Sequence, residues 1–199
     1  DLKDPNAYNP ERSKQLLAED GWKDTDGDGI LDKDGKPLTF NFVVYNSRAE
    51  LPLYAEAVQA DLKKVGIDMK IKTVDYNLID KMGQEGDYDM LISNIVTANT
   101  GDPIWFLANY WHTNNNGSNP QNGSGYSNPQ VDQLLDAAET EFDPAKRRDY
   151  AIQIQQLLMN DGAALFLGYP KTNIVTGSYL KGAVMYPSDY YWITNKITK

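Results

Sequence analysis

The chain has 199 residues, of which 41% are hydrophobic and 24% charged, and its formal net charge is −9. This composition is typical of a folded globular protein, and the acidic charge argues against nucleic-acid binding, because phosphates need a basic surface. The absence of cysteine excludes disulfides, zinc–thiolate sites and a cysteine nucleophile, and no apolar run in the sequence reaches the roughly 18 residues of a membrane span.

The first predicted element is a helix over residues 10–20. Asn9 and Pro10 form an N-cap followed by a first-turn proline, and Gly21 ends the segment. The helix leads directly into an acidic loop, DTDGDGILDKDG, at residues 24–35.

The acidic loop has part of the pattern of a calcium site. Oxygen ligands at alternate positions suit a hard cation, and the candidate structural calcium ligands are Asp24, Asp26, Asp28, Ile30 and Asp32. The last position of such a loop requires a bidentate Glu, but here it is Gly35. The alternative interpretation is a solvated turn in which Asp and Gly supply the turn conformations.

An alternating pattern of strands and helices follows. Period-two alternation predicts strands at 38–44, 67–73 and 88–96, and amphipathic spacing predicts helices at 51–65 and 76–83. Strands separated by helices need crossover connections, so the fold class is α/β, with a central mixed sheet flanked by helices.

The chain changes character after residue 97. A loop, TANTGDP, precedes the apolar segment IWFLANYW and the polar segment HTNNNGSNPQNGSG. Asn128-Pro129 and Asp143-Pro144 predict the starts of two more helices. A short apolar strand is expected at 164–167, and the rest reads as turns and extended segments.

The sequence contains no recognisable catalytic motif. The single histidine, His112, has no G-x-S-x-G motif with which to form a triad, and neither a P-loop nor G-x-G-x-x-G is present. No pair of carboxylates stands out as a glycosidase pair. The chain is therefore expected not to be an enzyme.

Residues 99–116 are instead rich in side chains suited to recognition. Aromatic walls with a few placed polar groups are typical of ligand pockets, and the candidate binding residues are Asn99, Thr100, Tyr110, Trp111, His112, Asn114, Asn115 and Asn116. For Trp111 and His112 plain surface exposure is an equal alternative, whereas Trp105 and Phe106 are expected to face the core. His112 is also a candidate transition-metal ligand.

Several segments together resemble one known family. They are NPERSKQLLAEDGW, DTDGDGILDKDGKPLTFNF, YAEAVQADLKKVGIDMKI, YDMLISN, TGDPIWFL and YSNPQVDQLLDAAETEFDPAKRRDYAIQIQQLL. They are similar to the C-terminal part of extracytoplasmic solute-binding proteins of the peptide/nickel class, which deliver ligands to ABC importers.

The resemblance implies one lobe of a two-lobed periplasmic-binding-protein-like fold. Residues 1–199 would be the C-terminal ligand-binding lobe, with residues from about 170 to 199 packing toward the first lobe. It also implies membrane ABC permease subunits as partners, a monomer, and an extracytoplasmic location with a lipid anchor in a preceding segment. The acidic loop would then be a family hairpin and any calcium structural; no cofactor is expected.

The cargo implied by the resemblance is nickel or a metal chelate. Peptide binders have an Asp where this chain has Asn99, and a neutral amide lacks the charge to pair with a peptide's α-ammonium. Nickel binders have a His at the spacing of Asn115, and His112 lies three residues earlier. The alternatives are an oligopeptide or dipeptide binder, a calcium-dependent structural module, and a hydrolase.

Overall fold

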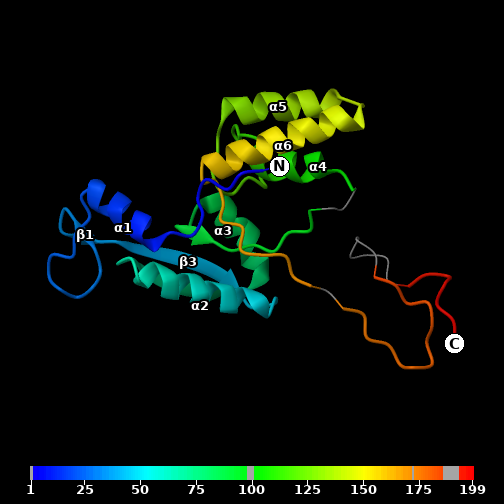
Figure 1. Ribbon diagram of the computed structural model, residues 1–199, viewed down its shortest axis with the longest axis horizontal. Coiled ribbons are helices and arrows are strands. Elements are labelled where there is room, and N and C mark those ends of the chain that lie inside the picture. Colours follow the sequence, from blue (N-terminus) through cyan, green and yellow to red (C-terminus); the bar gives the residue numbers. More distant parts are fainter. Residues whose placement is uncertain (1, 98–100, 172, 186–192) are drawn as a thin grey trace.

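Two packed units, an α/β unit and a three-helix unit, make up the body of the computed structural model (Figure 1). The structure describes residues 2–97, 101–171, 173–185 and 193–199. Asn99 and Thr100 lie outside these residues.

A three-stranded parallel sheet forms the centre of the α/β unit. The middle strand, β3 (Thr39–Tyr45), pairs with β4 (Asp68–Val74) on one side and with β5 (Met90–Leu91) on the other. Antiparallel pairing occurs outside this sheet, in a separate hairpin of β1 (Asp32–Lys33) and β2 (Lys36–Pro37) and in two isolated bridges, Lys23–Asp32 and Lys181–Thr198. The strand predicted at 88–96 is thus much shorter than expected, and the two longer strands are confirmed.

Helices cover this sheet because the crossovers between parallel strands require them. α2 (Glu50–Lys63) links β3 to β4, and η1 (Tyr76–Leu78) with α3 (Ile79–Glu85) links β4 to β5. Together with these helices, the sheet buries the second half of the middle strand, from Phe42 to Tyr45. The core of this unit contains Phe42, Val43, Val44, Tyr45, Leu51, Ala55, Met69, Ile79, Met82 and Ile92.

Gly66 ends the α2 segment in a conformation that few other residues adopt. Its φ is +84°, and a Cβ at this position would lie 2.6 Å from Cγ of Leu31. Glycine is therefore required both for the backbone angle and for the close approach of Leu31 in the acidic loop.

The N-terminal helix α1 (Pro10–Glu19) packs through a small separate cluster. Asn9 caps it by accepting a hydrogen bond from the Arg12 amide at 2.9 Å. Its Leu17 packs beside Trp22 against the buried Leu38, Val65 and Ile67. This contact fixes the acidic loop at the end of the α/β unit.

The three-helix unit consists of α4 (Pro103–Trp111), α5 (Pro129–Thr140) and α6 (Pro144–Asn160). Each helix begins with an Asp or Asn cap followed by proline, as the sequence predicts for α5 and α6. Figure 1 shows α5 and α6 side by side, with α4 next to them. Their core contains Ile104, Leu107, Trp111, Val131, Leu135, Ala138, Ala151, Ile154 and Leu158.

The end of the chain differs most from expectation. Residues 164–167 form no strand, and Leu165 and Phe166 are exposed. The described tail residues 173–185 and 193–199 run away from both packed units, with one bridge between Lys181 and Thr198 (Figure 1). Within the described ranges, no helix has the length and apolar character needed to cross a membrane.

Candidate functional site

The carboxyl edge of the parallel sheet gathers polar groups from three elements. Tyr45 ends β3, and its hydroxyl accepts a hydrogen bond from the Asn94 amide at 3.0 Å. The side-chain amide of Asn94 donates to Oε1 of Glu50, at the start of α2, also at 3.0 Å. Ligands of open α/β sheets bind outside this edge, which makes it the candidate binding site.

Aromatic rings stand beside these polar groups. The rings of Tyr45 and Tyr76 meet edge to face, with centroids 5.1 Å apart. Tyr45 is only 2% exposed, whereas Tyr76 is 57% exposed and turns one side of its ring to solvent. Tyr76, held by this contact with the buried Tyr45, therefore offers an apolar ring surface at the sheet edge.

Tyr110 brings the three-helix unit to the same neighbourhood. Burial raises the pKa of its phenol, and the nearby Asp80, Tyr76 and Tyr45 raise that pKa further. Its ring also lies 5.2 Å from that of Phe106. Of the predicted binding residues that the structure describes, Tyr110 is thus the one that comes close to the sheet edge.

Sequence reasoning missed four residues of this edge: Tyr45, Glu50, Tyr76 and Asn94. A partial signal was available, because Tyr45 and Tyr76 follow predicted strands and Glu50 directly precedes a predicted helix, whereas Asn94 lies inside the strand predicted at 88–96. The set offers rings, an amide and a carboxylate, and these groups bind organic polar ligands by stacking and hydrogen bonding.

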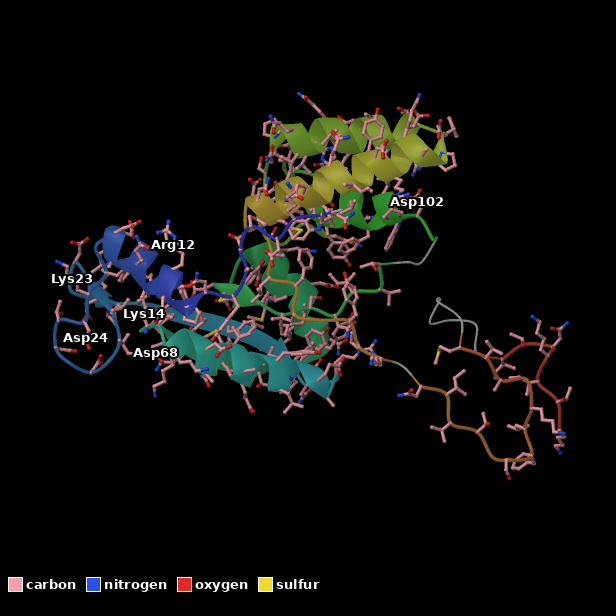
Figure 2. The ribbon with its side chains drawn as sticks, viewed as in Figure 1. Arg12, Lys14, Lys23, Asp24, Asp68 and Asp102 are labelled. Carbon is pink, nitrogen blue, oxygen red and sulfur yellow. The ribbon has the colours of Figure 1, made fainter. Side chains whose placement is uncertain are left out.

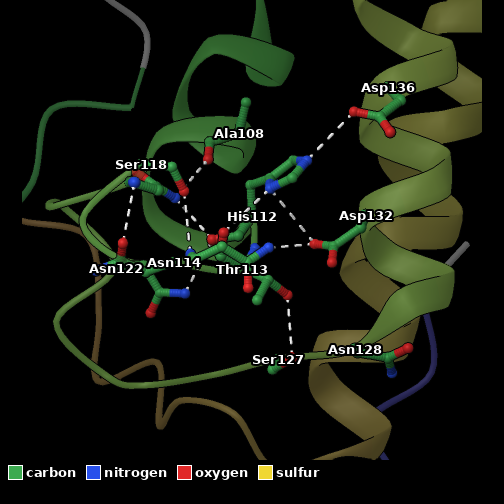
Figure 3. A network of polar contacts seen from close by, with 12 residues as sticks. Ala108, His112, Thr113, Asn114, Ser118, Asn122, Ser127, Asn128, Asp132 and Asp136 are labelled. Carbon is green, nitrogen blue, oxygen red and sulfur yellow. Dashed lines mark hydrogen bonds and ion pairs between the residues drawn. The ribbon is translucent and has the colours of Figure 1, made fainter.

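His112 lies in a polar network between α4 and α5 (Figure 3). Its Nε2 is 3.2 Å from Oδ1 of Asp136, and its Nδ1 is 3.6 Å from Oδ1 of Asp132. Asp132 also accepts the backbone N–H of Thr113 at 2.9 Å. The imidazole therefore joins the end of α4 to the exposed side of α5.

The pKa of His112 reflects opposing influences. Burial lowers it, but the Asp136 carboxylate, the Thr113 carbonyl and the Asp132 carboxylate together outweigh burial and raise it above the ordinary value. A raised pKa favours imidazolium, which binds no metal. In this conformation both ring nitrogens face groups of the chain itself.

The asparagine-rich loop after His112 folds back on itself. The side chains of Asn119 and Asn122 both donate to the His112 carbonyl, at 2.7 and 3.0 Å. Asn114 accepts the Asn119 amide through its side chain, and the Asn115 amide donates to Ser118. The predicted residues Asn114, Asn115 and Asn116 thus lie in a structured turn, in which Asn116 has a φ of +54°.

Trp105 and Trp111 both lie in surroundings that differ from those expected. Trp111 is 8% exposed and packs in the core of the three-helix unit, edge to face with Tyr126. Its Nε1 has no hydrogen-bond partner among the described residues. Trp105, expected to face the core, is 37% exposed. The 3.6-residue period turns position 111 inward, with Ile104 and Leu107.

The acidic loop lies far from the sheet edge and from α4. Figure 2 shows Asp24 at one end of the molecule and Asp102 at the start of α4. Carboxylate oxygens of Asp24, Asp26 and Asp28 lie within 4.8 Å of one another, a spacing that fits a hard cation.

The same carboxylates also hold the loop by themselves. Asp24 accepts the amides of Gly27 and Gly29, at 2.7 and 3.0 Å. Asp32 accepts the amide and hydroxyl of Thr25. The loop therefore has its turn structure from its own hydrogen bonds, and a cation would bind to an already formed loop.

Comparison with known proteins places the chain in a family. A model of the middle part of bacterial extracellular solute-binding proteins, family 5, matches residues 1–118. The oligopeptide-binding protein AppA of Bacillus subtilis is 31% identical over 187 residues, which are 90% of this chain and 33% of AppA. The nickel-binding protein NikA of Staphylococcus aureus is 25% identical over 199 residues, 99% of this chain and 38% of NikA.

Solved structures agree with the fold. AppA in complex with a nonapeptide superimposes with a TM-score of 0.80 at 29% identity, over 99% of this chain and 39% of AppA. NikA from Brucella suis with Fe(III)-EDTA has a TM-score of 0.68 at 27% identity, over 81% of this chain and 32% of NikA.

The chain spans about a third of the length of these relatives. The family comprises periplasmic or extracytoplasmic proteins that bind solutes for transport. Since the family model matches more than half of the residues, the chain belongs to the bacterial extracellular solute-binding proteins of family 5.

Proposed function

We propose that this chain is part of the substrate-binding component of an ABC importer and forms one wall of the cleft for an extended, peptide-like ligand. The observation that carries the proposal is the carboxyl edge of the sheet, where the exposed face of Tyr76 lies beside the linked side chains of Tyr45, Asn94 and Glu50. The similarity to AppA, solved with a nonapeptide, supports a ligand of this class.

The neutral side chain of Asn99 bears on how the peptide would be held. At that position the chain offers an amide where peptide binders are expected to have a carboxylate. An amide can hydrogen-bond a main-chain group but forms no ion pair. The ligand is therefore a peptide held through its main chain, without dependence on a charged N-terminus at Asn99.

A metal chelate is the second candidate, favoured by the partly exposed imidazole of His112 and by the similarity to NikA from Brucella suis, solved with Fe(III)-EDTA. In that case His112 would leave Asp132 and Asp136 to reach the cargo, with Tyr110 and residues 114–116 around it. Only neutral imidazole binds a metal, so this cargo would bind more tightly as the pH rises.

We extend the proposal to the place of this chain in a longer protein. It would be the C-terminal lobe, and the exposed apolar side chains of the tail would pack against the other lobe; they include Tyr169, Val175, Tyr179, Val184 and Ile193. The protein would act as a lipid-anchored monomer that hands its cargo to membrane permease subunits. Calcium in the acidic loop would serve stability alone.

The test is calorimetric titration of the full-length protein with two probes, an acetylated and amidated neutral nonapeptide and the nickel–histidine complex. We expect the peptide to bind, and Tyr76→Ala to weaken its binding about fivefold, because one ring contact contributes roughly 1 kcal/mol. Tyr8→Ala is the control, since Tyr8 is an exposed tyrosine near the N-terminus.

Each other outcome has a definite meaning. Binding of the nickel complex alone, lost in His112→Ala, would replace the peptide with the second candidate. Binding of neither probe, by a protein that melts cooperatively, would contradict both cargo assignments.

A further inference from the structure

A second surface of the three-helix unit has the same five-residue pattern on two neighbouring helices. Residues 130–134 of α5 read QVDQL, and residues 153–157 of α6 read QIQQL. This spacing places two glutamines and a leucine on one face of each helix. The two faces line one groove of about 450 Å³, formed by Gln130, Gln133, Leu134, Gln153, Gln156 and Leu157.

The groove is uncharged and rich in free amides, on a chain with a net charge of −9. The side chains of Gln130 and Gln133 make no hydrogen bond to other described residues. Gln153 makes only a long one, of 3.3 Å, to the Asp149 carbonyl. Each glutamine amide offers donors and an acceptor, the combination that a peptide group requires from its partner.

The chain itself shows what such a glutamine binds. Oε1 of Gln156 accepts the backbone N–H of Lys3 at 2.9 Å, and its Nε2 donates to the Lys3 carbonyl at 2.9 Å. One side chain thereby satisfies both main-chain groups of a residue in a non-helical segment, as a neighbouring β-strand would.

The chain's own N-terminal segment stays on the far side of Gln156. Its described hydrogen bonds to α6 go to Gln156 and, through Asn6, to the Met159 carbonyl. A separate hollow on that side is lined by Lys3, Asp4, Pro5, Gln156 and Asn160. The groove proper is lined by α5 and α6 alone.

We propose that this groove is a docking site for an extended segment of a partner polypeptide, held through its main chain. Gln130, Gln133 and Gln153 pair with backbone amides of the segment in the way that Gln156 pairs with Lys3. Leu134 and Leu157 form the apolar floor against which alternate side chains pack. Recognition then depends on extended conformation and neutral charge more than on sequence.

The test is NMR titration of the chain, labelled with ¹⁵N, using the peptide acetyl-Thr-Val-Thr-Val-Thr-amide as probe. We expect shifts of the side-chain amides of Gln130, Gln133 and Gln153, and none of Gln15, an exposed glutamine of α1. The double variant Gln130→Ala/Gln133→Ala should weaken binding about tenfold, as loss of main-chain hydrogen bonds predicts, and Gln15→Ala should not. A probe N-methylated at both valines lacks two main-chain donors and should bind more weakly.

Four results would overturn the proposal. One is absence of shifts at the glutamines up to millimolar probe. Another is equal binding of the N-methylated probe, which would exclude main-chain recognition. The third is concentration-dependent shifts of the same glutamines without probe, which would assign the groove to contact between two copies of this chain. The fourth is shifts at Tyr76 and Asn94 alone, which would show that the probe binds at the proposed cargo site and not in the groove.

Discussion

At the scale of single residues, His112 connects helices α4 and α5 with the asparagine-rich loop, a set of contacts that the sequence did not predict. It contacts Asp132 and Asp136 through its ring, and its carbonyl is held by Asn119 and Asn122. In the sequence, a single histidine after an aromatic segment gives no sign that Asp132 and Asp136 will be its partners. The two aspartates are one helical turn apart on α5, so their convergence depends on how α4 packs against that helix.

The raised pKa of His112 predicts a pH-dependent contribution to stability. A group whose pKa is higher in the folded than in the unfolded state stabilises the fold below its unfolded pKa, near 6.5, and loses that effect as the pH rises through the folded pKa. We expect the melting temperature of the wild type to exceed that of His112→Gln at pH 5.5 and the difference to shrink by pH 8.

Asp136→Asn is the matched control for this prediction. It removes the carboxylate nearest to Nε2 and should reduce the difference between pH 5.5 and pH 8. An advantage of the wild type that grows toward pH 8 would show that the imidazole is stabilising in its neutral form, contrary to this account.

Gly123 is a second residue whose role only the structure reveals. Tyr88 donates a hydrogen bond to its carbonyl, and a Cβ at Gly123 would lie 3.3 Å from Cα of Gly83 in α3. We expect Gly123→Ala to lower the free energy of unfolding by about 1–3 kcal/mol, because the backbone of α3 would have to move. Urea denaturation measures this change.

Gly83→Ala provides the opposite expectation at the same contact. The new methyl group would lie at an ordinary 3.9 Å from Cα of Gly123, and alanine favours the helix by about 0.5–1 kcal/mol. If Gly83→Ala stabilises the fold and Gly123→Ala destabilises it, the tight contact lies at the Cβ position of Gly123. Equal effects of the two substitutions on the free energy of unfolding would contradict this assignment.

At the scale of elements, local signals predicted the helices well and the strands unevenly. Helices that start at Asn9, Asn128 and Asp143 have caps readable from neighbouring residues, and the structure confirms them. Strands depend on distant partners. Residues 164–167 are apolar but have no neighbour to pair with among the described residues, and of 88–96 only Met90 and Leu91 pair with β3.

The candidate site was predictable only in part, for the same physical reason. Sequence composition directed attention to residues 99–116, and of these Tyr110 comes toward the sheet edge. Tyr45, Glu50 and Asn94 lie 44 to 49 residues apart in their two hydrogen-bonded pairs. Parallel pairing of β3 and β5 creates that proximity, and no local pattern reports it.

The acidic loop is an element whose calcium binding can be tested. Calcium should bind with a dissociation constant of about 0.1–1 mM, since the bidentate Glu of a full loop is absent. At 10 mM calcium this would stabilise the fold by about 1.4–2.7 kcal/mol. Asp26→Asn should abolish the calcium-dependent rise in melting temperature while keeping the turn, because an amide oxygen can still accept the Asp28 amide.

Asp149→Asn is the control for the calcium prediction, since Asp149 is an exposed acid of α6, away from the loop. An unchanged melting temperature of the wild type from 0 to 10 mM calcium would leave the loop as a hydrogen-bonded turn only. Loss of cargo binding in Asp26→Asn, at unchanged stability, would contradict a purely structural role.

At the scale of the whole molecule, the exposed apolar side chains of the tail support the proposal that it packs against another lobe. Tyr169, Val175 and Ile193 are almost fully exposed, whereas equally apolar side chains of the two units are buried. Exposed apolar groups in such number mark surfaces that pack against another body. We expect amides of 173–185 to exchange rapidly with deuterium in the isolated chain and to gain protection in the full-length protein.

The last prediction concerns what the isolated chain can bind. Its two units each have their own core, so residues 1–199 should fold and melt cooperatively on their own. The sheet edge, however, leaves Tyr76 57% exposed, and a ligand enclosed from one side forms about half of the contacts that closure of a cleft provides. Calorimetry should therefore show no binding of the neutral nonapeptide at micromolar concentrations to residues 1–199, and clear binding to the full-length protein. Micromolar or tighter affinity of the isolated chain, lost in Tyr76→Ala, would mean that this sheet edge is a complete site and that a second lobe is not needed to hold the ligand.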